Sequence, residues 1–355
     1  MLHGLSFLPD SDEGNSIGLA APEYFSMVRA LSAIADEAGL SHIKMTEHYG
    51  NAYGGYCPSP LILLSAIASQ TSQVRLMTGA LLPVFHHPVQ VASEAAMLDV
   101  LSSGRLDLGV ARAYMPYEYD AFEVSLDSSR SRFDETVGLI QRLWTGDRIT
   151  ANGQHFHFDD VRCLPRPVQR PGPPIWVAAV MTPTSFVEAG RNGFGLLITP
   201  SLSRFTEMAE LVATYRDSFR PSETFPTSTV LASLPLYVGT DQVLAERTAD
   251  PLLTQYLRVW ANAADSWSRR TSSDYRGYTG MSRAIRSMTA SRMRAGGGAV
   301  VGSPAQVVDR IETTAAALDV DGFLWQVDFG GATADIAVPS VERLVSEVIP
   351  AIDRA

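Results

Sequence analysis

A carboxylate, an imidazole and a phenol stand next to one another at Glu47, His48 and Tyr49. They follow a short apolar run with the composition of a buried strand, so they would lie just beyond the end of that strand. A histidine in such a place can exchange a proton near neutral pH and hydrogen-bond a developing anion. It can also do no more than hydrogen-bond a loop carbonyl. We take His48, with Glu47 beside it, as the candidate catalytic residues.

Two arginines follow a later apolar run and could bind a phosphate. Arg112 comes directly after residues 104–111, and Arg130 lies a short loop later in the sequence DSSRSRFDE. A guanidinium offers a forked pair of donors, so two of them at one rim would suit a phosphate. The alternative is that Arg130 or Arg132 pairs with Asp134 or Glu135 on the surface of a helix. The spacing alone leaves both roles open.

The sequence AAVMTPTS at residues 178–185 has the small residues and hydroxyls that a flat, anionic ligand needs. Thr182, Thr184 and Ser185 stand at an expected helix start, where backbone N–H groups favour an anion. The same residue types are also ordinary helix caps. Ala178 and Ala179 would let a flat ring approach the backbone.

The run MTGALLPVFHHP carries two further features. Gly79-Ala80 interrupts an apolar strand, which indicates a bulge or a ligand close to the backbone. His86 and His87 suggest a metal, but no third histidine or carboxylate at a suitable spacing accompanies them. We expect both to cap the following helix or to face solvent, and we predict no metal site.

These residues fall at the ends of short apolar runs that alternate with longer segments of helical period. Eight strands, each followed by a helix, predict a (β/α)8 TIM barrel, in which all strands end at the same face. An open doubly wound sheet is the alternative, but no G-x-G-x-x-G follows the first strand. The predicted strands are residues 2–8, 42–46, 74–83, 104–111, 173–180, 193–199, 230–238 and 321–328. The predicted helices are residues 22–38, 60–70, 89–101, 132–144, 184–191, 204–216, 241–261, 304–318 and 341–352.

We expect one domain over residues 1–355, with two insertions. Residues 145–171 are rich in Gly, Pro and His and are expected to wrap the surface. Residues 262–298 have little periodicity, and a structureless stretch of that length is a lid or binding loop, or plain surface disorder. As a lid, this segment could use Tyr275, Tyr278 and Met281 to close a pocket against water.

The composition is that of an ordinary soluble protein and argues against a nucleic-acid partner and a membrane span. The 355 residues are 46% hydrophobic with a mean hydropathy of +0.03. A net charge of −10 and a pI near 5.2 leave no basic stripe for a nucleic acid. The cationic residues are almost all arginines, with Lys44 the single lysine. Two cysteines, no long uncharged apolar run and no signal-peptide pattern lead us to expect a cytoplasmic protein without a disulfide framework or membrane span.

Taken together, these motifs resemble the bacterial luciferase-like flavin-dependent monooxygenases. The matching sequences are ADEAGLSHIKMTEHY (residues 35–49), the stretch from PSPLILLS to GVARAY (58–114), SRSRFDETVGLIQRLW (129–144), PRPVQRPGPPIWVAAV (165–180) and, more weakly, GSPAQVVDRI (302–311). The block HPVQVASEAAMLDVLSSGRLDLGVAR at residues 87–112 is the most specific of them. The resemblance covers most of residues 2–199 and implies a TIM barrel with a lid insertion after strand seven.

The resemblance also implies a role for each matching residue. The family's strand-two histidine falls on His48, where it would act as a general base, and two phosphate-binding arginines fall on Arg112 and Arg130. Gly79-Ala80 falls on a non-proline cis peptide beneath the flavin ring. The implied cofactor site comprises Gly79, Ala80, Arg112, Tyr114, Arg130, Ala178, Ala179, Val180, Met181 and Thr184. The substrate end is expected at Tyr49, Tyr53, Tyr56 and Cys57.

The chain departs from the family's pattern at three points. Val180-Met181 stands where the luciferases have Glu-Ser, which removes one polar phosphate contact. Ala111 takes the place of their reactive cysteine and leaves room over the flavin. Ala113 replaces the common glycine after the arginine. None of these changes removes the histidine.

The implied activity is that of a two-component monooxygenase. FMN reduced by a separate NAD(P)H:flavin reductase (FMNH2) would react with O2 to give a C4a-hydroperoxide, which would transfer one oxygen atom to an organic substrate. The apolar and aromatic lining suggests a substrate with a sizeable hydrophobic part, such as a natural-product intermediate. One branch of the family uses the deazaflavin F420, so an F420-dependent oxidoreductase is the first alternative. A non-catalytic flavin-binding subunit is the second, and a homodimer is expected.

Overall fold

Parallel strands close into a barrel in a computed structural model that describes residues 1–10, 19–201 and 205–354. Around the barrel the strands follow one another in the order β1, β2, β3, β4, β7, β8, β9 and β11, and β11 pairs again with β1. The predicted (β/α)8 barrel is therefore confirmed. The barrel strands are β1 (Leu2–Phe7), β2 (His42–Met45), β3 (Arg75–Thr78), β4 (Leu106–Val110), β7 (Ile175–Ala179), β8 (Gly195–Ile198), β9 (Val230–Val238) and β11 (Gly322–Gln326).

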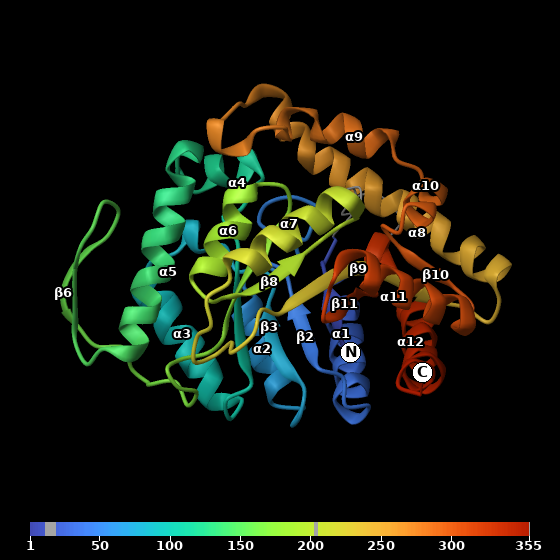
Figure 1. Ribbon diagram of the computed structural model, residues 1–355, viewed down its shortest axis with the longest axis horizontal. Coiled ribbons are helices and arrows are strands. Elements are labelled where there is room, and N and C mark those ends of the chain that lie inside the picture. The colour runs from blue at the N-terminus through green and yellow to red at the C-terminus, as the bar shows by residue number, and fades with distance from the viewer. Residues whose placement is uncertain (11–18, 202–204, 355) are drawn as a thin grey trace.

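Helices cover the outside of the barrel (Figure 1). In α1 (Ala21–Glu37) the buried side chains Val28, Leu31 and Ala35 recur every three to four residues. The helix ends before Gly39, whose φ of 71° is one that glycine adopts easily. The other flanking helices are α2 (Pro60–Ala68), α3 (Pro88–Leu101), α5 (Ser129–Thr145), α6 (Pro183–Arg191), α7 (Phe205–Ser218), α11 (Pro304–Leu318), α12 (Ala334–Arg343) and, after one π-helical turn, α13 (Ile349–Ile352).

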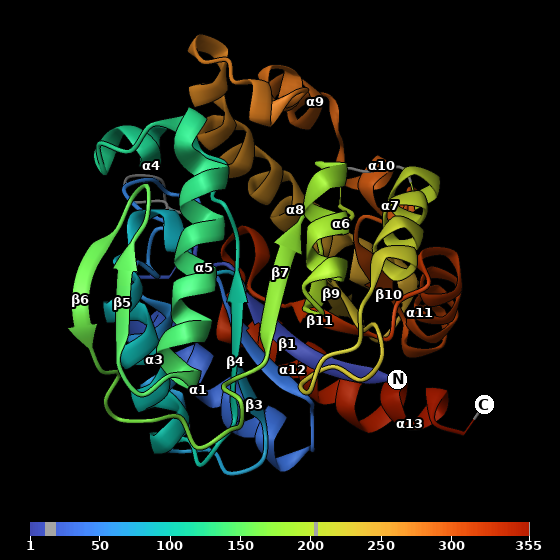
Figure 2. The ribbon, with the colours of Figure 1, turned by 60° about the vertical axis from the view of Figure 1, so that its left-hand side comes forward.

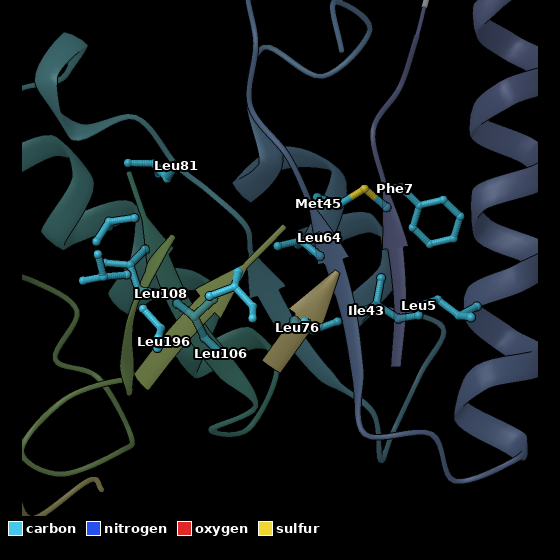
Figure 3. Close-up of a cluster of buried hydrophobic side chains, with 14 of the residues drawn as sticks. Leu5, Phe7, Ile43, Met45, Leu64, Leu76, Leu81, Leu106, Leu108 and Leu196 are labelled. Atoms are coloured by element: carbon cyan, nitrogen blue, oxygen red, sulfur yellow. The ribbon is translucent and has the colours of Figure 1, made fainter. Parts of the chain in front are cut away.

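Side chains fill the space on both sides of the strands. Between strands and helices lies a large apolar cluster, in which Leu5 and Phe7 lie on the α1 side of β1 (Figure 3). Because successive residues of a strand point to opposite faces, the intervening positions point into the barrel. There a second apolar cluster fills the part nearer the strand N-termini. Its members are Met77, Trp176, Leu197, Phe225, Leu231 and Leu324.

The insertion at residues 145–171 forms a hairpin that the sequence did not predict. The strands β5 (Ile149–Asn152) and β6 (His157–Val161) pair antiparallel to each other. Figure 2 shows this hairpin outside α5, away from the barrel. Both strands are too short and too exposed to show a clear alternation of apolar and polar residues.

Residues 262–298 form a series of short helices, not the structureless stretch that was predicted. The preceding α8 (Gln242–Ala264) runs further than expected and leads into η3 (Asp265–Arg269), η4 (Ser273–Tyr275), η5 (Tyr278–Gly280), α9 (Met281–Ser287) and α10 (Ala290–Ala295). Buried aromatic residues, among them Trp260 and Trp267, join α8 to these turns. Helices of three to seven residues are too short to produce a periodic pattern, which explains the error. In Figure 1, α8 and α9 lie across the end of the barrel to which the strands point.

Other element boundaries differ in detail. The predicted strand 74–83 is shorter in the structure, where β3 ends at Thr78 and the cis peptide Gly79-Ala80 follows it. The last helical segment begins at Ala334, earlier than predicted. The short α4 (Pro116–Ala121) and the added strand β10 (Val300–Gly302), which pairs with β9, were not predicted. Among the described residues, no helix has the length and apolarity needed to cross a bilayer.

Candidate active site

A cavity of about 460 Å³ lies at the C-terminal ends of the barrel strands, beneath α8 and the short helices that follow it. His48 from the end of β2, Arg112 from the end of β4 and Arg130 from α5 all line this cavity. The barrel therefore brings together three residues that are far apart in the sequence. The predicted site residues in its wall are Glu47, His48, Tyr53, Gly79, Ala80, Arg112, Tyr114, Arg130, Ala178, Ala179 and Val180.

The His48 imidazole is held by a buried carboxylate. Its Nδ1 lies 2.9 Å from Oε1 of Glu118, which is fully buried on α4 and also accepts the backbone N–H of Tyr49 at 3.1 Å. The ring of Tyr53 packs against the imidazole, with 4.9 Å between centroids. With Nδ1 occupied, Nε2 is the ring nitrogen that can exchange a proton with a molecule in the cavity.

Glu47 makes a different set of contacts. Its buried carboxylate accepts the backbone N–H of Leu82 at 2.7 Å, the hydroxyl of Tyr49, and a hydrogen bond from Nε2 of His86 at 2.6 Å. Burial acts to lower the pKa of His86, but the hydrogen bond and charge of Glu47 outweigh it and raise that pKa. His86 was expected to cap a helix or face solvent, and that prediction is wrong. For His87 it is confirmed, because its Nδ1 accepts the backbone N–H of Val89 at the start of α3.

The two arginines lie on the wall of the cavity, and their hydrogen bonds to described residues are long. Arg112 reaches Oγ of Ser129 and a carboxylate oxygen of Asp274, each at a long 3.5 Å. Arg130 reaches Oγ of Ser185 at 3.4 Å. Burial lowers the pKa of Arg130, and the positive charge of Arg112 acts in the same direction. A bound anion would act in the opposite direction on this pKa.

Glu135, which was considered as an alternative partner for Arg130, is engaged elsewhere. Its carboxylate accepts three backbone N–H groups of residues 154–156, at 3.0–3.1 Å. Asp134 lies in the cavity wall and acts on Arg130 through its charge. Glu135 therefore does not pair with Arg130 on the helix surface. Arg130 lines the cavity instead.

At β7 and β3 the backbone itself forms part of the wall. Ala178, Ala179 and Val180 line the cavity, and so do Thr182 and Ser185 at the start of α6. Met181 and Thr184, which were also predicted to bind the cofactor, are exposed and are not in the lining.

The Gly79-Ala80 peptide is cis, as the resemblance implied. A Cβ atom on Gly79 would lie 2.3 Å from Cγ of Lys44, so this position has no room for a side chain.

Three of the four residues predicted for the substrate end lie elsewhere. The ring of Tyr49 packs against Phe122, and Tyr56 packs against Tyr24 on α1. Cys57 is 2% exposed within the core between strands and helices. The structure contradicts their predicted place, because the turns at Gly50 and Gly54 redirect the chain after His48. Tyr53 alone of the four lines the cavity, and its hydroxyl accepts the hydroxyl of Tyr114 at 2.9 Å.

Sequence reasoning missed several residues of the site. Glu118 gave no signal, because its helix is only six residues long. Lys44 did give one, as the single lysine and a charged residue inside an apolar strand. The remaining lining residues that were not predicted include Ser6, Asp134, Ser233, Tyr256, Trp260 and Gln326.

The cavity fits a flavin mononucleotide. Arg112, Arg130 and Ser185 could hold its phosphate with donors that the protein uses only at long distances. Ala178, Ala80 and Gly79 line the cavity with small residues, beside which a ring could lie.

Comparison with known proteins supports the same assignment. Residues 7–321 match the sequence profile of the family described as luciferase-like monooxygenase. The oxygenase component of the flavin-dependent trigonelline monooxygenase of Acinetobacter baylyi is 29% identical, over 92% of this chain and 89% of its own. The crystal structure of the monooxygenase RslO1 of Streptomyces bottropensis superposes with a TM-score of 0.85 and 32% identity, over 99% of both chains. An F420-dependent hydroxymycolic acid dehydrogenase of Mycobacterium tuberculosis is 30% identical, over 61% of this chain and 60% of its own.

Proposed function

The chain belongs to the family of luciferase-like monooxygenases, and we propose on this basis that it is the oxygenase component of a two-component system. In this proposal it uses reduced FMN and O2 to insert one oxygen atom into an organic substrate with a sizeable hydrophobic part. A separate flavin reductase supplies the reduced flavin. The observation that carries the proposal is that His48, Arg112 and Arg130 all line one cavity at the catalytic face of the barrel.

The arginine side of the cavity binds and orients the cofactor. Arg112 and Arg130 take the phosphate through charge-assisted hydrogen bonds, and this fixes which end of the flavin points toward β2. The flat wall at Ala178 and Gly79-Ala80 then supports the ring. Reduced flavin, when bound, supplies the two electrons that activate O2.

The His48 side manages protons. Glu118 holds the imidazole through Nδ1, so a proton can move at Nε2 toward or from a reacting oxygen in the cavity. The carboxylate of Glu118 also stabilises the imidazolium that forms when Nε2 takes a proton. Glu47, by contrast, has its oxygens occupied by Leu82, Tyr49 and His86, and in this proposal it positions the loop that carries His48.

The segment after α8 keeps water out of the cavity. Tyr275, Tyr278 and Met281 are nearly buried and form part of its wall. Exclusion of water protects a reactive oxygen species from hydrolysis and strengthens the electrostatic interactions around it. We propose that this segment opens and closes as a lid during turnover.

A direct test follows the fate of O2 in the absence of substrate. Anaerobically reduced FMN is mixed with the protein and then with O2 in a stopped-flow spectrometer, while H2O2 is assayed in parallel. The proposal expects a species with near-ultraviolet absorbance distinct from oxidised FMN, and H2O2 release slower than from free reduced FMN. Release at the rate of free flavin would refute the oxygenase assignment.

The second candidate is an F420-dependent oxidoreductase, which the identity to the mycobacterial dehydrogenase favours. The same apparatus tests it. Tight binding of F420H2 that remains stable in air, together with no binding of FMN, would replace the first proposal by the second. A non-catalytic flavin-binding subunit would bind FMN but show no effect of His48→Ala on the oxygen reaction.

A further inference from the structure

The deep end of the cavity, nearest the centre of the barrel, has a polar floor that the proposed function leaves unused. Ser233 and Gln326 stand two residues beyond Leu231 and Leu324 of the inner apolar cluster, so they belong to the next inward layer. All members of this floor line the cavity and are less than a tenth exposed. This floor consists of Ser6 (β1), Lys44 (β2), Ser233 (β9) and Gln326 (β11).

The floor holds more hydrogen-bond donors than acceptors. Nζ of Lys44 donates to Oγ of Ser233 at 3.1 Å, and the Ser233 hydroxyl donates to Oγ of Ser6 at 3.2 Å. The Ser6 hydroxyl accepts this bond and donates to no described residue, and Nε2 of Gln326 is buried without a partner among the described residues. A buried donor with no acceptor destabilises the fold, so such a set is expected where another molecule completes it.

The floor also carries a positive charge, and no carboxylate of the described residues forms an ion pair with it within 4.0 Å. Asp328 is the carboxylate that acts on Lys44, but its Oδ2 is taken by the Leu8 backbone N–H at 3.0 Å and the Tyr24 hydroxyl at 2.8 Å. Burial lowers the pKa of Lys44 to about 8, against the opposing charge of Asp328. At neutral pH the group is therefore mainly an ammonium, and its methylene chain passes directly against Gly79.

We propose that the floor binds an anionic or carbonyl oxygen on the molecule in the deep end of the cavity, with Lys44 as the positioning residue for that oxygen. Ser6 and Gln326 supply the additional donors. The inference rests on the proposed function in that FMN and an organic substrate share this cavity. Either can bear the oxygen, because the flavin ring has carbonyls that gain negative charge on reduction, and the substrate can be a ketone, phenolate or carboxylate.

The test compares three variants of the full-length protein. Lys44→Met keeps the length of the side chain and removes its charge, and Ser6→Ala removes the terminal donor. Thr78→Val is the matched control, because the Thr78 hydroxyl is buried on the neighbouring strand but bonds the Gly109 carbonyl and is not in the cavity lining. Thermal unfolding of each variant shows that it folds.

Two measurements separate the two sources of the oxygen. The first gives the dissociation constant and the midpoint potential of bound FMN. If the flavin bears the oxygen, Lys44→Met weakens binding of reduced FMN at least tenfold more than that of oxidised FMN, which lowers the potential by about 30 mV for a two-electron couple. The second gives the dissociation constants of 2-naphthoate and naphthalene, with and without FMN. If the substrate bears it, Lys44→Met abolishes a preference for 2-naphthoate of at least tenfold.

Ser6→Ala should change the same quantity as Lys44→Met, either the FMN potential or the preference for 2-naphthoate, by a smaller factor. Thr78→Val should change neither the potential nor the preference. The proposal is overturned if folded Lys44→Met and Ser6→Ala leave the FMN potential and the naphthoate preference unchanged. Failure of the proposed function looks different. There the parent protein would bind no FMN, while 2-naphthoate binding would still report on the floor.

Discussion

Two clusters at opposite ends of the barrel contain the same kinds of side chain, but they differ in how fully those side chains bond one another. At the N-terminal ends of the strands, Asp107 accepts hydrogen bonds from Nε of Arg75 at 2.6 Å and Nη2 at 2.9 Å, and lies 3.1 Å from Nε2 of His42. Arg75 also donates to the Leu106 carbonyl and to Gln169. A histidine, a carboxylate and an arginine thus satisfy one another.

At the C-terminal ends of the strands, the histidine and the arginines of the cavity use only part of their hydrogen-bonding groups for contacts with described residues. His48 bonds Glu118 through Nδ1, while Oε2 of Glu118 has no partner among the described residues. Arg112 and Arg130 reach their protein partners only at 3.4–3.5 Å. The lesson is that residue type does not distinguish a stabilising cluster from a reactive one. The distinction lies in which atoms still lack a partner, as expected for the two faces of such barrels.

The largest effect that this comparison predicts is on catalysis. His48→Ala should lower kcat by about 10²- to 10⁴-fold, the usual contribution of a positioned general acid or base, with FMN affinity changed less than threefold. His42→Ala at the other end is the matched control. It should lower the melting temperature and leave kcat of the folded protein nearly unchanged. Equal losses of kcat in both variants would remove the distinction between the two ends.

The next effect is on stability. Asp107→Asn should lower the free energy of unfolding by about 3 kcal/mol, because it breaks a buried ion pair and leaves Arg75 and His42 underbonded. Burial acts to raise the pKa of Asp107, but the hydrogen bonds from His42 and Arg75 outweigh it and lower that pKa. The carboxylate thus stabilises the fold above the pKa that it has in the unfolded chain, and the contribution is lost as pH falls through the lower folded pKa. Urea titrations of parent and variant should therefore converge at acidic pH.

A third prediction concerns the two arginines of the cavity wall. Arg112→Ala or Arg130→Ala should weaken FMN binding by roughly 10- to 100-fold, because each removes charge-assisted hydrogen bonds worth about 1.5–3 kcal/mol. Riboflavin, which has no phosphate, should bind both variants as it binds the parent. Flavin fluorescence titrations measure the two ligands. Equal losses for FMN and riboflavin would contradict the phosphate assignment.

The sequence predicts the barrel because its information is local and repeated. Each strand is a short apolar run, each helix has a periodic buried face, and the strand Val230–Val238 and the helix Pro304–Leu318 were predicted to the residue. Segments without such repetition were missed. The hairpin at residues 149–161 and the short helices of residues 262–298 are defined by tertiary packing, in which residues such as Trp267 are buried by partners distant in sequence.

For the candidate site, the sequence likewise predicted residues at strand ends and missed those placed by loops and short helices. Residues at strand ends, such as His48 and Arg112, have a place that follows from the topology alone. Glu118 could not be found in this way, because its contact with His48 spans 70 residues and depends on a turn of helix with no signature. Tyr56 and Cys57 were misplaced because side-chain direction in a loop is set by glycine turns, not by a period. Lys44 was visible as an anomaly, but its role required knowing that it points into the barrel.

The smallest predicted effect has the opposite sign to the others. If the cavity is built for ligands at the expense of stability, removing the buried charge of its floor should stabilise the fold. The pKa of Lys44 falls from 10.5 to about 8, a shift that costs roughly 3 kcal/mol at pH 7, against which Lys44→Met loses one charged hydrogen bond of about 1.5–3 kcal/mol.

The net gain should be about 1 kcal/mol, measured as a higher urea midpoint at pH 7. Because the folded pKa lies below the unfolded one, the penalty is complete below about pH 8 and declines as pH rises toward 10.5, so the gain should shrink in that range. A destabilised Lys44→Met at pH 7 would mean that Lys44, like Asp107, is part of the scaffold. A Lys44→Met variant that is more stable but has lost its ligand preference would show that Lys44 serves ligand binding.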